Sequence, residues 1–168
     1  MTTPLEPREF FRGTWTGKGE LVMNALLRWF APNEQIQMTS EAIWLSETVW
    51  LVKDHFEFSS GRVIDRKMFS ELIASDRIHV TADDMPLGAD ILLNESGFRF
   101  TPYHIVAQHR GFAIRLRCID ENTIDASGFV HGCVKMSFWG FPVATMRLGP
   151  ISRHDAGADS GYAVPDSK

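Results

Sequence analysis

The sequence predicts an all-β protein, a single antiparallel up-and-down barrel of eight to ten strands. Apolar residues recur with a period of two rather than 3.6. The apolar segments are short, and compact turn-like stretches such as Ser59-Ser60-Gly61 and Gly140-Phe141-Pro142 separate them. A long antiparallel meander must also hide its edge strands, and closure into a barrel does so. A two-sheet sandwich is the alternative that the same pattern allows.

The first strand is expected at residues 11–22. Trp15, Gly17, Gly19 and Leu21 share one face of this segment, and polar residues occupy the other face. This alternation is typical of a half-buried strand, with glycines where the strand bends or is closely approached.

The next strands alternate in the same way. Residues 48–58 place Trp50 on a face with Phe56 and Phe58, and residues 62–73 place Met68 on a face with other apolar residues. The remaining strands are expected at 36–45, 77–82, 90–93, 97–106, 111–119, 123–130, 134–138 and 143–148, with a loop at 83–88 and a turn at 120–122.

Residues 23–31, with the sequence MNALLRWFA, interrupt the strand pattern. Leu26, Leu27, Trp29 and Phe30 lie close together in this segment. It is expected to be either a strand extension or short helix packed on the barrel, or an apolar lid over the barrel mouth.

Composition excludes several classes of protein. The chain has 168 residues, 17 Lys and Arg against 21 Asp and Glu, a formal net charge of -4 and 44% apolar residues. This is too apolar for a disordered chain, and it has no run of about 20 apolar residues that could cross a membrane. The lack of a basic stripe argues against a nucleic-acid partner. A homodimer is compatible with the sequence.

The length fits one domain, which we expect to cover residues 1–152. Residues 153–168 are small and polar, and are expected to form a flexible tail. The first twelve residues do not resemble a signal peptide, so the expected location is the cytoplasm. There, Cys118 and Cys133 would stay reduced. They belong to no CxxC motif, which argues against a metal site.

Two charged residues interrupt the apolar faces. Asp54 alternates with Trp50 and Phe56, and Arg66 alternates with Met68. The turn at 59–61 makes Asp54 and Arg66 cross-strand neighbours in the simplest hairpin register. They are expected to form an internal salt bridge that fixes the register, or a polar anchor for a ligand. A general-base role for Asp54 is disfavoured, because a paired arginine would lower its pKa.

Other polar residues are assigned mostly to the surface. Tyr103 and His104 point to opposite faces, so one of them lies inside, and Pro102 predicts an edge or a bulge beside them. Arg115 and Arg117 are expected in solvent, as is the Asp83-Asp84 turn. His131 is expected to be a surface residue, with haem ligation as the alternative.

Gly13-Thr14-Trp15 at the start of a first strand resembles the motif of the lipocalins and related calycin barrels. The resemblance implies that Trp15 plugs the closed end of the barrel and that a late-strand arginine, Arg147, packs across it. Stretches such as 54–61 and 135–143 further resemble an uncharacterised bacterial family of such barrels, of unknown function. This resemblance implies a fold but no catalytic residues.

The function expected from these observations is non-catalytic binding of a small hydrophobic or amphipathic molecule, with no cofactor and no metal. The expected ligand-binding residues are Trp50, Asp54, Phe56, Phe58, Arg66, Met68, Phe100 and Tyr103. One alternative is an isomerase or cyclase acting on an apolar substrate, which would need a second inward acid or base. Another is a filled barrel that acts as an interaction module through the apolar residues of 23–31.

Overall fold

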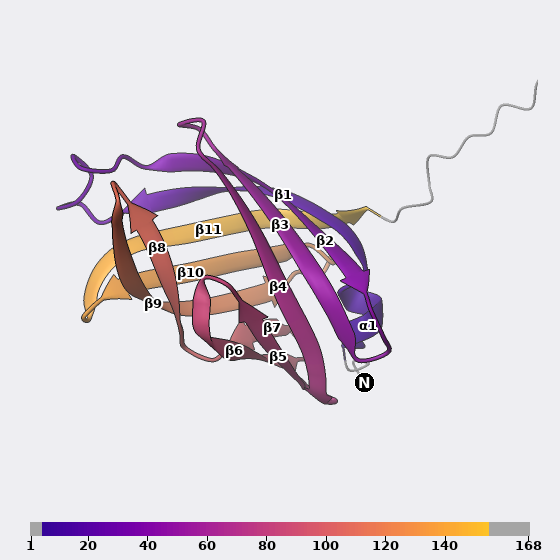
Figure 1. The fold of residues 1–168 in the computed structure, drawn as a ribbon. Coiled ribbons are helices and arrows are strands. Elements are labelled where there is room, and N and C mark those ends of the chain that lie inside the picture. Colours follow the sequence, from indigo (N-terminus) through magenta and orange to yellow (C-terminus); the bar gives the residue numbers. More distant parts are fainter. Residues whose placement is uncertain (1–4, 155–168) are drawn as a thin grey trace, which may run out of the picture.

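The computed structural model describes residues 5–154 and consists of β strands with one short helix (Figure 1). The elements are α1 (Pro7–Phe10), β1 (Gly13–Met23), β2 (Glu34–Trp44), β3 (Val49–Phe58), β4 (Val63–Ala74), β5 (Arg77–Ala82), β6 (Met85–Asn94), β7 (Gly97–Phe100), β8 (Tyr103–His109), β9 (Phe112–Ile124), β10 (Val130–Phe138) and β11 (Phe141–His154). Most of the expected tail lies outside the described residues, although Arg153 and His154 belong to β11.

The strands form a closed antiparallel barrel of ten strands with one extra strand. Neighbours follow the order β10-β11-β1-β2-β3-β4-β5-β6-β7-β9, and β9 pairs with β10 to close the ring. The extra strand, β8, pairs with the first half of β9, beyond the segment that pairs with β7. The predicted barrel is confirmed, and the sandwich alternative is wrong.

Pro102 divides the expected strand 97–106 into β7 and β8. Thr101 and Pro102 lie outside both strands, because proline has no N–H group to donate to the sheet. The Thr101 N–H bonds instead to the carbonyl of Asp90.

Three expected boundaries are wrong. The turn expected at 120–122 lies inside β9, and the strand expected at 123–130 contains a turn at 125–128. The Asp125 carboxylate accepts the N–H groups of Ser127 and Phe129 and so fixes this turn. The loop expected at 83–88 is only the two-residue turn Asp83-Asp84, because β6 begins at the buried Met85.

The barrel has two different ends. The helix end carries α1 and the connections after β2, β4, β6 and β9, and the hairpin end carries those after β1, β3, β5, β8 and β10. At the helix end, Phe10 packs against Trp15 with ring centroids 5.1 Å apart, and Phe11 packs against Trp50 at 5.9 Å. These contacts close the helix end with aromatic rings.

Residues 24–31 form successive turns at the hairpin end rather than a strand extension or a helix. Leu27 N–H bonds to Asn24 O, and Phe30 N–H bonds to Leu27 O. Leu26, Trp29 and Phe30 are exposed there, and Leu27 is partly buried, so this segment leaves most of its large apolar side chains in solvent. Among the described residues, no helix is long and apolar enough to cross a membrane.

Candidate functional site

The interior of the barrel contains a cavity of about 180 Å³. Its wall is mostly aromatic and aliphatic, and it is interrupted by six polar side chains. The polar members are Ser40, Asp54, Arg66, Tyr103, Asp120 and Asn122. An apolar protein cavity of about 150 Å³ holds a benzene molecule, so this space suits one substituted ring.

Six of the eight expected ligand residues line this cavity: Asp54, Phe56, Arg66, Met68, Phe100 and Tyr103. The other two lie elsewhere. Trp50 is buried in the core and stacks on Trp44 at 4.4 Å, and Phe58 lies beneath the guanidinium of Arg62 at 4.0 Å.

Asp54 and Arg66 are cross-strand neighbours on β3 and β4, as the turn at 59–61 predicts. Arg66 nevertheless makes its ion pair with Asp84, with 3.0 Å between Nε and Oδ1. The long arginine side chain reaches the β5–β6 turn. The sequence analysis expected this turn to be in solvent, but its Asp84 is the partner of Arg66. The Arg66 Nη2 atom is buried and has no hydrogen-bond partner among residues 5–154. An unsatisfied donor therefore belongs to the lining of the cavity.

Asp54 is buried and hydrogen-bonds Ser40 on β2. Burial raises the pKa of its carboxyl above the ordinary value, although the Ser40 hydrogen bond and the Arg66 charge oppose this shift. The sequence argument considered only the nearby arginine and expected a lowered pKa. Desolvation of the carboxylate is the larger effect here.

Three polar residues of the cavity were not among the expected site residues, and the charged one is Asp120. It is buried on β9 and accepts hydrogen bonds from Tyr103 Oη at 3.3 Å and Asn122 Nδ2 at 2.8 Å. Burial raises the pKa of Asp120 to about 6. The available signal was the alternation of Leu116, Cys118 and Asp120, which continues the inward face of β9.

The neighbouring hydroxyl and thiol remain protonated at neutral pH. Burial, together with the Asp120 charge, raises the pKa of Tyr103 and raises the pKa of Cys118 to about 12. The positive charge of Arg66 opposes the pKa shifts of both groups and that of Asp120. The guanidinium is thus the central counter-charge of the interior polar cluster.

The arginine over Trp15 is Arg153 rather than Arg147. The Arg153 guanidinium lies 5.9 Å from the ring centroid of Trp15, its register partner on β11, and Nη1 donates to the carbonyl of Glu9 at 2.6 Å. Arg147 points outward and pairs with Glu20 at 3.4 Å. Arg147 lies between the inward Met146 and Leu148, and the register shift opposite Gly17 and Gly19 changes the alternation before Arg153.

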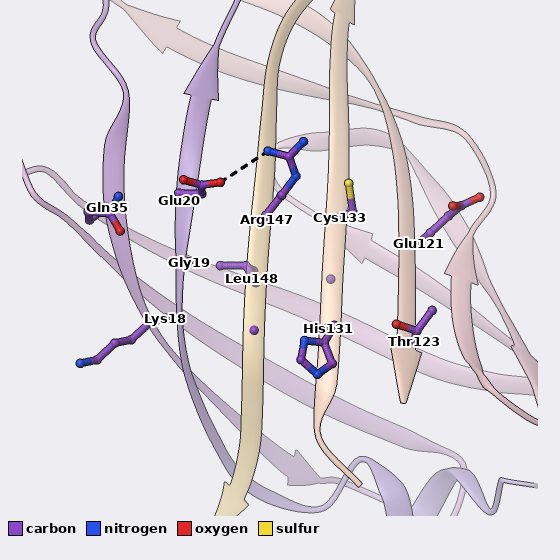
Figure 2. A pocket seen from close by; sticks show the side chains of 12 residues that line it. Lys18, Gly19, Glu20, Gln35, Glu121, Thr123, His131, Cys133, Arg147 and Leu148 are labelled. Carbon is purple, nitrogen blue, oxygen red and sulfur yellow. Dashed lines mark hydrogen bonds and ion pairs between the residues drawn. The ribbon is translucent and has the colours of Figure 1, made fainter. Parts of the chain in front are cut away.

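A second hollow, of about 580 Å³, lies on the outer face across β1, β2, β9, β10 and β11 (Figure 2). Glu20, Cys133, Arg147 and His131 line it, and its ion pair between Arg147 and Glu20 is exposed. His131 also pairs with Asp125 at 2.9 Å, as a surface histidine would. It does not line the interior cavity, so nothing in that cavity supports the haem alternative.

No group of three or more His, Cys, Asp or Glu residues within positions 5–154 is arranged to hold a metal ion.

Tyr103, rather than His104, is the inward member of its pair. Arg115 and Arg117 are exposed on β9, as expected.

No protein-family model and no curated protein sequence matches the chain. Among solved structures, the S-type phycobiliprotein lyase CPES from Guillardia theta is similar at a TM-score of 0.61 and 12% identity, over 90% of this chain and 94% of that one. A designed fluorescence-activating β-barrel, at 13% identity over 89% of this chain and 99% of the other, reaches a TM-score of 0.43. The first of these likenesses shows the fold, an antiparallel β-barrel, which agrees with the barrel that the Gly13–Trp15 resemblance implied.

Proposed function

We propose that this lipocalin-like barrel binds a small, mostly apolar molecule in its interior cavity. The observation that carries the proposal is the buried Nη2 atom of Arg66, which has no hydrogen-bond partner among residues 5–154, in a side chain that lines a largely apolar cavity. A buried donor without an acceptor is costly, and a ligand oxygen at this position would remove that cost.

The cavity restricts the size and the chemistry of the ligand. About 180 Å³ accommodates a single substituted ring, and Phe56, Phe98 and Phe100 supply aromatic contacts for it. The polar end of the ligand would accept a hydrogen bond from Arg66. An aromatic ketone, an aldehyde or a phenol meets these requirements, and unsubstituted toluene lacks the acceptor.

The test compares acetophenone with toluene by calorimetric titration of the wild-type protein and an Arg66→Lys variant. The variant keeps the positive charge but loses the planar fork of donors. We expect the affinity for acetophenone to fall about tenfold, because a hydrogen bond from a charged group contributes roughly 1.5–3 kcal/mol. The affinity for toluene should stay unchanged.

Arg62→Lys is the matched control, since Arg62 is an arginine of the hairpin end outside the cavity lining. It should leave both affinities as in the wild type. Failure of the wild-type protein to bind any one-ring ligand would refute the proposed function.

An enzymatic alternative rests on Asp120. A carboxyl group with a pKa of about 6 beside Tyr103 can both accept and donate a proton near neutral pH. This alternative requires that bound acetophenone exchange its methyl protons with deuterated solvent, observed by NMR. Asp120→Asn should then abolish the exchange while acetophenone still binds. Binding without exchange in the wild-type protein would favour the binding function.

A further inference from the structure

Three connections at the hairpin end carry exposed apolar side chains. The aromatic rim consists of Leu26, Trp29 and Phe30 after β1, Phe112 after β8, and Trp139 and Phe141 after β10. The exposed fractions of Trp29, Phe112 and Trp139 are 81%, 74% and 94%. The three connections follow one another around the barrel, because β8, β9, β10, β11, β1 and β2 are successive neighbours in the sheet.

The backbone at Trp139 does not favour a tryptophan. Trp139 and Gly140 form a two-residue hairpin loop in which both φ angles are positive, 49° and 80°. This is the pattern of a type I′ turn, whose first central position favours Asn, Asp or Gly. The fold therefore does not account for a tryptophan at this position.

The β8–β9 hairpin repeats this arrangement with an arginine. Arg110 and Gly111 have φ angles of 47° and 82°, and they join the register pair at the ends of β8 and β9. Two equivalent turns thus carry an arginine and a tryptophan where the backbone favours a small polar residue.

The charge of the rim has the opposite sign to that of the whole chain. Residues 24–33, 110–112 and 138–141 include Arg28 and Arg110 and no Asp or Glu, in a chain of net charge -4. The acidic turn Asp83-Asp84 belongs to the same end and lies beside β8, where the Asp84 carbonyl accepts the N–H of Val106, but the Asp84 carboxylate is paired with Arg66. Exposed aromatics and arginines thus form one sector of the hairpin end.

We propose that the aromatic rim docks this protein on the surface of an anionic lipid bilayer. Tryptophan and phenylalanine partition into the interfacial layer of a membrane, and arginines attract anionic headgroups. The apolar groups stand on separate loops, which suits a deformable layer of lipid. The expected cytoplasmic location would bring the rim to an anionic leaflet.

The test measures co-sedimentation of the full chain with phosphatidylcholine vesicles that contain or lack phosphatidylglycerol. The wild-type protein should sediment with the anionic vesicles. Trp139→Asn should lower the partition coefficient about tenfold, because it removes a large interfacial side chain. Since asparagine suits the turn, the variant's thermal unfolding midpoint should equal or exceed that of the wild type.

Arg110→Asn separates the electrostatic contribution. It should reduce binding to anionic vesicles about fivefold and leave binding to neutral vesicles unchanged. Leu45→Ser and Phe129→Ser are the controls, because both remove exposed apolar side chains at the helix end. They should sediment as the wild-type protein does.

Three outcomes would overturn the proposal. The first is the absence of wild-type binding to anionic vesicles. The second is an equal loss in the two controls. The third is a concentration-dependent dimer, seen by analytical ultracentrifugation and lost in Trp139→Asn, because the rim would then bind a second copy of the chain.

Discussion

Arg66→Met is expected to destabilise the protein by about 3–5 kcal/mol at neutral pH, as removal of one member of a buried charge cluster does. Arg66 pairs with Asp84 and is the counter-charge that favours the ionised forms of Asp54 and Asp120. Methionine fills similar volume but leaves two buried carboxylates uncompensated. Urea unfolding of the variant and the wild type measures the loss.

This loss should depend on pH in a defined direction. The pKa values of Asp54 and Asp120 lie above their ordinary value of 3.8 in the folded protein, and removal of Arg66 raises them further. The folded state then binds more protons than the unfolded state above about pH 4, so stability falls as the pH rises. The deficit of Arg66→Met should therefore shrink when the pH is lowered from 7 to 5.

Arg62→Met provides the comparison, since Arg62 is also an arginine in an ion pair, with Glu34 at 2.9 Å, but is half exposed. The free energy of unfolding of this variant should fall by less than about 1 kcal/mol. Equal losses for the two variants, or a deficit of Arg66→Met that does not depend on pH, would show that Arg66 does not compensate buried carboxylates.

Asp120→Asn is expected to stabilise the protein at pH 7–8 by up to about 3 kcal/mol. The pKa of Asp120 is 3.8 ordinarily and about 6 in the folded protein, and each pKa unit corresponds to about 1.4 kcal/mol. A raised carboxyl pKa favours the folded state below the unfolded value, and this contribution is lost as the pH rises through about 6. The wild-type protein should lose stability as the pH rises from about 4 to about 6, and the variant should lose less.

Asp125→Asn is the control for this effect. The hydrogen bond with His131 lowers the pKa of the exposed Asp125, so its contribution has the opposite sign and is lost as the pH falls. The decline between pH 4 and pH 6 should persist in this variant. A wild-type curve that is flat over that window would contradict the assignment to Asp120.

The alternation of apolar residues was sufficient to predict the strands that surround the site. The hairpin at 59–61 also fixed the register of Asp54 against Arg66, because a short turn leaves little choice of pairing. The ion pair between Arg66 and Asp84 could not be predicted in this way. It joins β4 to the turn after β5 and depends on the direction of a long side chain.

Asp120 and Arg153 were missed for a different reason. Asp120 and Asn122 were interpreted as a turn because they are polar, but their hydrogen bond inside the barrel lets β9 continue. Arg153 pairs in register with Trp15 only because β11 runs to His154, beyond the expected end of the last strand at 148. Polar residues inside a barrel and strand ends are both decided by tertiary contacts that a local pattern does not contain.

Closure of the barrel has a consequence for the order of folding. Most strands pair with a neighbour in sequence, but β1 must find β11, which is separated from it by most of the chain. Pairing between such distant segments costs loop-closure entropy, so the local hairpins are expected to form first. Asp54, Arg66 and Asp120 would then lose their water only when the ring closes. The step that completes the barrel is therefore also the step at which the buried charges oppose folding most strongly.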